Sequence, residues 1–182
     1  MPTPTWPPGI SRESVRAPSP VRFRTGVPVF VGYTERVTPT RAAPGTAEAE
    51  APEMRGWADF QDTFGAAVTP GPVADAGTGF LAPAVRGFFR NGGQVCRVVA
   101  LARPDDAASH AARHVAALES VDRLEDVDLL CLPDLLLPLA ELGLEAQRTG
   151  AEPDAGAVAA ARGNAAALHG EVLRYCGRRG DL

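Results

Sequence analysis

Short apolar runs along the chain predict three buried strands. Residues 27–33 (VPVFVGY) are β-branched and aromatic, with Pro28 near their start, and they predict the first core strand. Residues 94–101 (QVCRVVAL) and 128–132 (DLLCL) predict the second and the third, the last of them ended by Pro133. Such continuous apolar strands are typical of sheets that are covered on both faces.

Between these strands, apolar residues recur at helical spacing and predict amphipathic helices. The helices are expected over 56–65, over 80–91, from 104 towards 121, and from 153 onward. Their stripes, in chain order, are Trp57, Phe60 and Phe64; Leu81, Ala84, Val85 and Phe88; Ala111, Val115, Leu118 and Val121; and Val158, Ala161, Ala165, Leu168, Val172 and Tyr175. Residues 134–151 are ambiguous, since Pro138 and Gly143 interrupt any regular element.

The order of these elements (β, α, α, β, α, β, α) predicts an α/β fold with a mostly parallel or mixed sheet flanked by helices. We expect two parts: an extended, proline-rich N-terminal arm over 1–25, and a truncated α/β domain over 26–182. Mobile loops are expected at 38–55 and 66–78. The sequence stops just after a helix, where this architecture would add another strand, so the sheet is expected to be incomplete at its C-terminal end.

Composition narrows the possible functions. The chain has 182 residues, a formal net charge of −4 and a pI near 5.4, which argues against a nucleic-acid binder. It contains no apolar run of about 18–20 residues, so we expect no membrane anchor, and its N-terminus lacks the pattern of a signal peptide.

The three cysteines, Cys96, Cys131 and Cys176, are odd in number and far apart, which indicates reduced thiols and not a disulfide framework.

Few residues suggest catalysis. Gly77 and Gly79 begin a dinucleotide fingerprint, but a loop precedes them where that motif needs a strand. His110 and His114 are four residues apart without a third ligand, so they are expected on the surface. Aspartates at strand ends, Asp128 and Asp134, keep a small α/β nucleotide-binding enzyme open as an alternative. Otherwise we expect no enzyme, no cofactor and no metal site.

Taken in order, several blocks resemble the N-terminal half of contractile tail sheath proteins, which occur in phage tails and in phage-tail-like contractile injection systems of bacteria. The blocks are TWPPGISRESV, GVPVFVGYTERV, WADFQDTFG, LAPAVRGFFRNGGQVCRVVAL, DVDLLCLPDLL and a helix that ends in YCGRRGDL. The most specific is the Phe-rich helix followed by Asn-Gly-Gly and a cysteine-bearing strand. The family continues well beyond this stretch.

The resemblance implies a structural subunit that assembles around an inner tube in the bacterial cytoplasm, exchanges β-strands with its neighbours, and changes lattice on contraction. Its implied partners are copies of itself, other sheath subunits, and tube and baseplate proteins. The arm position is occupied by Pro8, Gly9, Ile10, Ser11, Arg12, Glu13, Ser14 and Val15. We expect Trp57, Phe60, Phe64, Phe88 and Phe89 to be packing anchors, and Asn91, Gly92 and Gly93 to form a turn. A degenerate or truncated paralogue that does not assemble is a further alternative.

Overall fold

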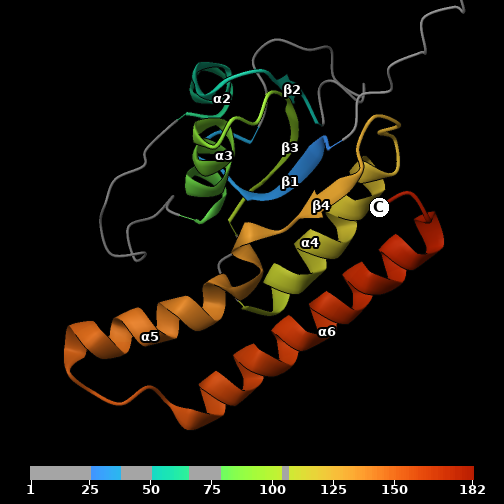
Figure 1. Cartoon of the computed structure of the whole chain (residues 1–182). Helices are drawn as coiled ribbons and strands as arrows, with labels where there is room; N and C mark the ends of the chain where they lie inside the picture. Colours follow the sequence, from blue (N-terminus) through green and yellow to red (C-terminus); the bar gives the residue numbers. More distant parts are fainter. Residues whose placement is uncertain (1–25, 38–50, 66–78, 104–106) are drawn as a thin grey trace, which may run out of the picture.

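The computed structural model describes residues 26–37, 51–65, 79–103 and 107–182, which form a four-stranded sheet flanked by helices (Figure 1). The strands are β1 Pro28–Tyr33, β2 Glu53–Met54, β3 Cys96–Leu101 and β4 Leu129–Cys131. Their order is β2-β3-β1-β4; β1 is parallel to β3 and to β4, and β2 is antiparallel to β3. The predicted α/β class with a mixed sheet is confirmed.

Helices connect the strands and extend beyond the sheet. They are α2 Trp57–Phe64, α3 Leu81–Arg90, α4 Ala107–Val121, the 3₁₀ turn η1 Pro133–Leu136, α5 Leu137–Thr149 and α6 Ala155–Arg179. Glycine ends several of them: Gly65 after α2 and Gly180 after α6 both have φ of 78°, a conformation that other residues adopt with strain. The Asp154 carboxylate accepts a hydrogen bond from the Ala157 N–H (2.8 Å) and caps the start of α6.

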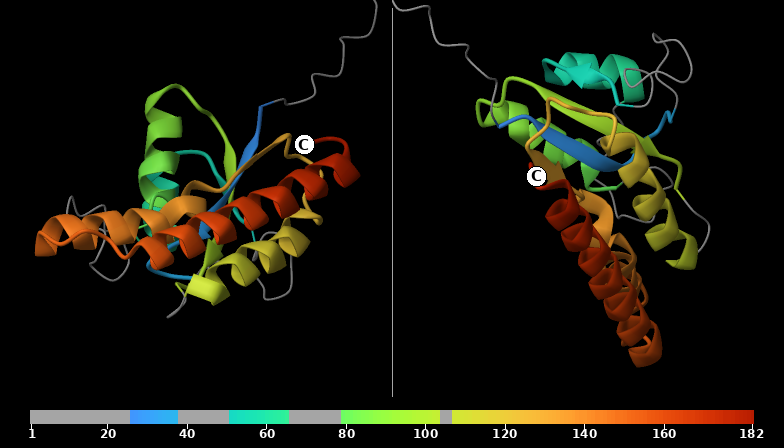
Figure 2. Two further views of the ribbon diagram at one scale, coloured as in Figure 1. Left: turned by 90° about the horizontal axis from the view of Figure 1, so that it is seen from below. Right: turned by 90° about the vertical axis from the view of Figure 1, so that its right-hand side faces the viewer.

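The sheet separates two apolar clusters, because successive side chains of β1 point to opposite faces. On one face Val29 and Val31 pack with Leu118 and Val121 of α4 and with Tyr175 of α6. On the other face Phe30 packs with residues of α2 and α3, namely Phe60, Phe64, Leu81 and Val85. Figure 2 shows the two helical layers on either side of the strands. The central strand β1 is buried along its whole length.

The α5–α6 hairpin projects past the edge of the sheet (Figures 1 and 2). The expected interruption at Pro138 and Gly143 is wrong, because α5 is continuous through both residues. Pro138 lies in the first turn of the helix, where its missing N–H costs no internal hydrogen bond. Gly143 lies in the middle of the helix, where glycine lowers helix stability, and the packing of α5 against α6 and η1 offsets this loss.

Two further expectations need correction. The loop predicted over 38–55 ends earlier than expected, since Ala51 is fully buried and 53–54 form β2; residues 38–50 and 66–78 lie outside the described residues. The inner face of α4 is also different: Val115 is exposed, whereas His110 and His114 are buried. Helix α4 is rotated relative to its apolar stripe because the two histidines find polar and aromatic partners in the core.

Candidate functional site

The five aromatic residues expected to be anchors lie on α2 and α3, against the same face of the sheet. Phe60 and Phe64 are fully buried, and Trp57 stacks on Phe60 with ring centroids 5.2 Å apart. Phe88 and Phe89 are half-buried, and Phe88 meets the Phe30 ring edge-on. These contacts join α2 and α3 to the central strand and give the aromatic set a role in packing within the subunit.

The Asn91–Gly93 turn connects α3 to the strand beside it. Asn91 closes the helix through its backbone N–H and its side-chain amide, both of which donate to the Gly87 carbonyl (3.0 and 2.8 Å). Gly92 has φ of 91°, and Gly93 lies against the Phe88 ring, where a Cβ would collide with it. The two glycines are therefore required by the turn itself and by the close approach of the ring.

Asp134 lies in a cradle at the carboxyl end of β1 and is completely buried. Its Oδ2 accepts the Tyr33 N–H (2.7 Å), and its Oδ1 accepts the Phe80 N–H at the start of α3. Gly32 and Gly79 leave the space that the carboxylate fills, since a Cβ on either would collide with it. Burial raises the pKa of this carboxyl, and the backbone donors act against that rise.

Next to this cradle, Tyr33, His110 and His114 form a buried polar cluster. His110 Nε2 lies 3.3 Å from the Leu135 carbonyl and must donate to it, so Nδ1 accepts the Tyr33 hydroxyl across 2.7 Å. Burial, and to a lesser extent the nearby His114, lower the pKa of His110 to about 4. Both histidines are thus held neutral in the core.

His114 is placed differently from its neighbour. Its Nδ1 donates to the His110 carbonyl (2.9 Å), and its Nε2 is buried without a hydrogen-bond partner among the described residues. The ring is also in edge-on contact with Tyr33. The earlier expectation of two surface histidines is wrong, since a tyrosine and backbone carbonyls satisfy most of their polar atoms.

This arrangement bears on the nucleotide-binding alternative. In α/β folds, a phosphate group binds to the N–H groups where a helix begins at the carboxyl end of a strand. Here the N–H groups of Tyr33 and Phe80, which a phosphate would use, already donate hydrogen bonds to the Asp134 carboxylate. Asp128, the other candidate, accepts the N–H groups of Gly26 and Val27 (3.0 Å for Val27) and thereby fixes the start of β1. The carboxylates of both aspartates therefore accept hydrogen bonds from backbone N–H groups of the same subunit.

The cysteines of the described strands lie in or near the core. Burial raises the pKa of Cys96 to about 12 and also raises that of Cys131, which is only partly buried. Within the described ranges, no group of three or more His, Cys, Asp or Glu side chains is arranged to hold a metal ion. No helix in those ranges is long and apolar enough to cross a membrane.

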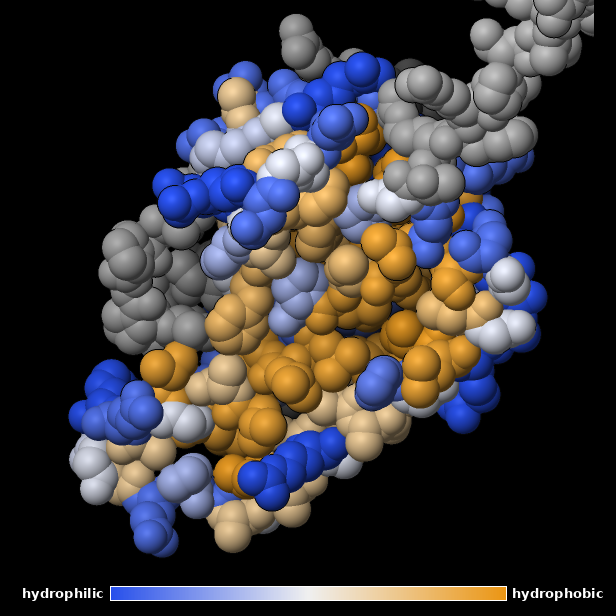
Figure 3. Space-filling view, in the orientation of Figure 1, coloured by the Kyte–Doolittle hydropathy of each residue, from blue (hydrophilic) through white to orange (hydrophobic). Residues whose placement is uncertain are grey.

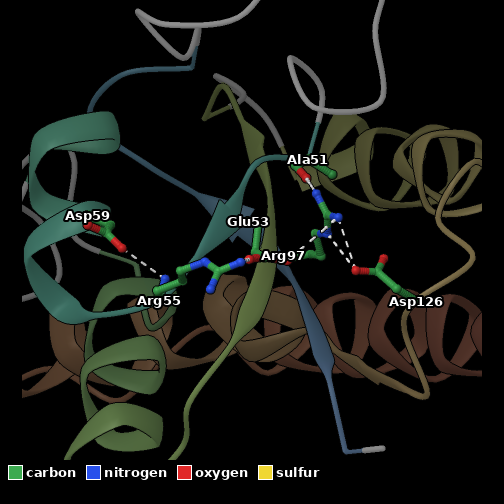
Figure 4. A network of polar contacts seen from close by, with 6 residues as sticks. All are labelled: Ala51, Glu53, Arg55, Asp59, Arg97 and Asp126. Carbon is green, nitrogen blue, oxygen red and sulfur yellow. Dashed lines mark hydrogen bonds and ion pairs between the residues drawn. The ribbon is translucent and has the colours of Figure 1, made fainter. Parts of the chain in front are cut away.

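One edge of the sheet is closed by a charged network (Figure 4). Arg97 of β3 binds Asp126 through Nε and Nη2 (3.3 and 3.0 Å) and the Ala51 carbonyl through Nη1 (3.2 Å). Glu53 of β2 forms an ion pair with Arg55 (2.7 Å). The backbone N–H of Arg55 donates a hydrogen bond to the Asp59 carboxylate on α2. A strand of two residues that carries such charges is a poor template for pairing with another chain.

The opposite edge is different. Among the described residues, β4 pairs with β1 and has no strand on its other side. Leu129 of β4 and Leu136 of η1 are about half exposed (51% and 52%). Figure 3 shows apolar side chains gathered over β4 and on into the space between α5 and α6. A contiguous exposed apolar patch on a protein surface often marks a site of contact with a partner.

That surface continues into a groove of about 560 Å³ between α5 and α6. The groove is apolar on its walls and charge-balanced on its rim, where Arg103 pairs with Glu141, and Arg148 with Glu145. The wall residues are Pro138, Leu142, Leu144, Ala157, Ala160, Ala161 and Asn164. No bulky side chain fills the groove from the α6 side, because that wall is built mainly from alanine.

The sequence did not reveal this groove, the Asp134 cradle or the histidine cluster. The one available signal for the cradle was Asp134 at the end of a strand. The arm residues 8–15 and the glycine Gly77 lie outside the described residues, so the structure places neither of them.

We compared the chain with known protein families, sequences and structures. No family model matches the chain, and no curated protein sequence matches it. A solved structure to which the chain is similar is the helical sheath of the anti-feeding prophage in its contracted state, with 25% identity and a TM-score of 0.41. The match covers 79% of this chain and 36% of that one, so this chain spans about a third of the length of that protein.

Proposed function

We propose that this protein is a structural subunit of the contractile sheath of a phage tail or of a phage-tail-like injection system, without catalytic activity. It assembles in the bacterial cytoplasm with copies of itself and with other sheath subunits, around an inner tube and on a baseplate. The observation that carries the proposal is the apolar β4 edge, which no strand of the described residues pairs with on its outer side, together with the sequence blocks that resemble the sheath family in order.

The distribution of charge supports assembly through the arm. Residues 1–25 contain four arginines and one glutamate, a net charge of +3, which leaves 14 basic and 21 acidic residues, or −7, in 26–182. A basic segment is attracted to the acidic body of a neighbour, and opposite charges speed encounter and favour the correct orientation. The arm therefore has an electrostatic reason to bind another copy.

The exposed edge supplies the hydrogen-bonding template. An extended segment that adds to an open sheet edge gains main-chain hydrogen bonds and pockets for alternate side chains. The β4 edge is open among the described residues, whereas the β2 edge is short and charged. We assign the β4 edge as the acceptor of the arm residues 8–15 from a neighbouring subunit.

The test compares assembly of the full chain with that of two variants, by light scattering and negative-stain microscopy. The full chain is expected to form rings or rows. Deleting residues 1–20 removes the arm and should leave a dispersed protein whose circular dichroism is unchanged. Leu129→Lys should have the same effect, because a charge on the edge strand opposes pairing.

Leu173→Lys is the matched control, because Leu173 is an equally exposed leucine (61%) that lies on α6. It is expected to assemble like the full chain. Unchanged assembly after deletion of the arm would refute the role of the arm. A full chain that stays monomeric at all concentrations would contradict the assembly itself.

A second measurement separates the sheath from the nucleotide-binding enzyme. Thermal unfolding is followed with and without nucleotides and divalent metal ions. A ligand that binds the native state raises the unfolding temperature. A sheath subunit should show no shift, whereas a clear shift with a nucleotide would favour the enzyme.

A further inference from the structure

Among the described residues of this subunit, no bulky side chain fills the groove between α5 and α6. Its volume of about 560 Å³ falls within the range of sites that hold small ligands, about 300–1,000 Å³. The apolar walls favour an apolar occupant. The charges on the rim are paired (Arg103 with Glu141, and Arg148 with Glu145), so the rim does not favour a charged occupant.

We propose that this groove receives Trp6 from the N-terminal arm of a second copy of the chain. This inference rests on the proposed assembly and adds the site where the tip of the arm is anchored. Trp6 lies in the proline-rich stretch MPTPTWPPG, two residues before the segment assigned to the β4 edge. A tryptophan buries about 150–250 Å², and such residues dominate the energetics of contacts between proteins.

The place where the arm is attached favours a second copy as the donor of Trp6, and the length of the arm allows it. The arm is attached at Gly26, at the amino end of β1, where Asp128 holds the chain. The groove lies beyond the opposite end of β1, where Tyr33 meets Asp134 and η1 leads into α5. The 19 residues between Trp6 and Gly26 span at most roughly 60–70 Å, so the arm can extend outward to a neighbour.

The contact that follows is head to tail. One end of the subunit donates the arm and the other end accepts it, so each copy can bind a further copy, and the row does not close on itself unless the rotation allows it. The apolar surface of Figure 3 is continuous from β4 to the groove. An arm that pairs with β4 can therefore continue over the same apolar surface into the groove.

The chain contains two tryptophans, so Trp57→Phe leaves Trp6 as the sole fluorescent indole. In this background, acrylamide quenching of Trp6 is compared between assembled and dispersed fractions of the full chain. We expect a several-fold lower quenching constant and a blue-shifted emission in the assembled fraction. Equal quenching in both fractions would overturn the inference while leaving the assembly in place.

Ala160→Leu fills the groove without lowering helix propensity, and Ala166→Leu is the matched control at an exposed position of α6 outside the groove. The first should restore full quenching of Trp6, and the second should leave it protected. Protection that is independent of protein concentration would show an intramolecular arm and overturn the second-copy assignment. Absence of any assembled fraction would overturn both this inference and the proposed function.

Hydrogen exchange gives a readout that does not depend on fluorescence. Trp6→Ala should increase exchange in α5 and in the first half of α6 within the assembled fraction, whereas Phe23→Ala, which also removes an arm aromatic, should not. If both variants exchange like the unmodified chain, Trp6 does not occupy the groove.

Discussion

The Tyr33 hydroxyl donates a hydrogen bond to Nδ1 of His110 across 2.7 Å, within a core that buries both residues. This bond joins the central strand to α4. Through His110 Nε2 and the Leu135 carbonyl it also reaches η1, from which the α5–α6 hairpin begins. The position of the hairpin therefore depends on a small polar cluster at one end of β1.

Tyr33→Phe tests this bond. The variant leaves His110 Nδ1 buried without a donor, which typically costs about 1–3 kcal/mol. Denaturant titration at pH 7 should show this loss of unfolding free energy. Tyr175→Phe removes a 3.3 Å contact with Arg179 and a hydrogen bond with the exposed Asp122, and it should lose less because water can replace the partner of an exposed carboxylate. Equal losses in the two variants would contradict a special role for the cluster.

The stability of the protein should fall as the pH drops from about 6.5 towards 4. The folded pKa of His110, about 4, lies below its ordinary value of 6.5, so the unfolded state binds the proton first in this range. Stability is then lost at up to about 1.4 kcal/mol per pH unit for such a group. The lowered pKa of His114 acts in the same direction.

Asp134 acts in the opposite direction, because a raised folded pKa means that the native state gains stability as the pH falls through it. The variant His110→Gln isolates the histidine contribution through the slope of stability against pH between 7 and 5, measured by denaturant titration. The slope should become smaller. A slope equal to that of the unchanged protein would contradict the lowered pKa of His110.

Arg179 near the end of α6 should stabilise α4. Its guanidinium donates to the carbonyls of Val121 (2.6 Å) and Leu124, at and just after the end of α4. Charged hydrogen bonds of this kind contribute about 1.5–3 kcal/mol. Arg179→Ala should lower the unfolding free energy by that order and increase hydrogen exchange at the end of α4. Arg178→Ala, its exposed neighbour, should change neither quantity.

Glycines on α6 should be replaceable without loss of folding. Gly163, Gly170 and Gly177 are seven residues apart, and a Cβ on any of them meets no other atom among the described residues. Each change to alanine should stabilise the helix by about 0.5–1 kcal/mol, measured by thermal unfolding.

Gly32→Ala provides the contrast. A Cβ there would strike the buried Asp134 carboxylate, so this variant should be strongly destabilised. Similar stability of Gly32→Ala and Gly163→Ala would contradict the cradle described above.

The sequence predicted the elements whose local signals are strong. Residues 28–33 form the central strand because the β-branched and aromatic run has no other stable environment than a core. Helices α2, α3 and α6 were predicted because their apolar residues repeat with the helical period and glycine marks their ends. The α/β class follows from the order of these elements.

Local pattern was insufficient where partners come from distant parts of the chain. Strand β2 has two residues and therefore no period, and it exists only because β3 offers it an edge. Helix α5 was not predicted because Pro138 suggested a break, although proline in the first turn of a helix removes no internal hydrogen bond. In each case a contact with another element decides the outcome.

The sequence by itself determined the buried strand, the helical stripes and the division of charge between a basic N-terminal segment and an acidic remainder, because these depend on residue type and spacing. Only the tertiary structure decided that His110 and His114 are buried, that Asp134 fills a backbone cradle, and that no described residue covers the outer side of β4 or the α5–α6 groove. The physical reason is that burying a polar group requires partners, and those partners are brought within hydrogen-bonding distance only when segments about 25 to 100 residues apart are packed together.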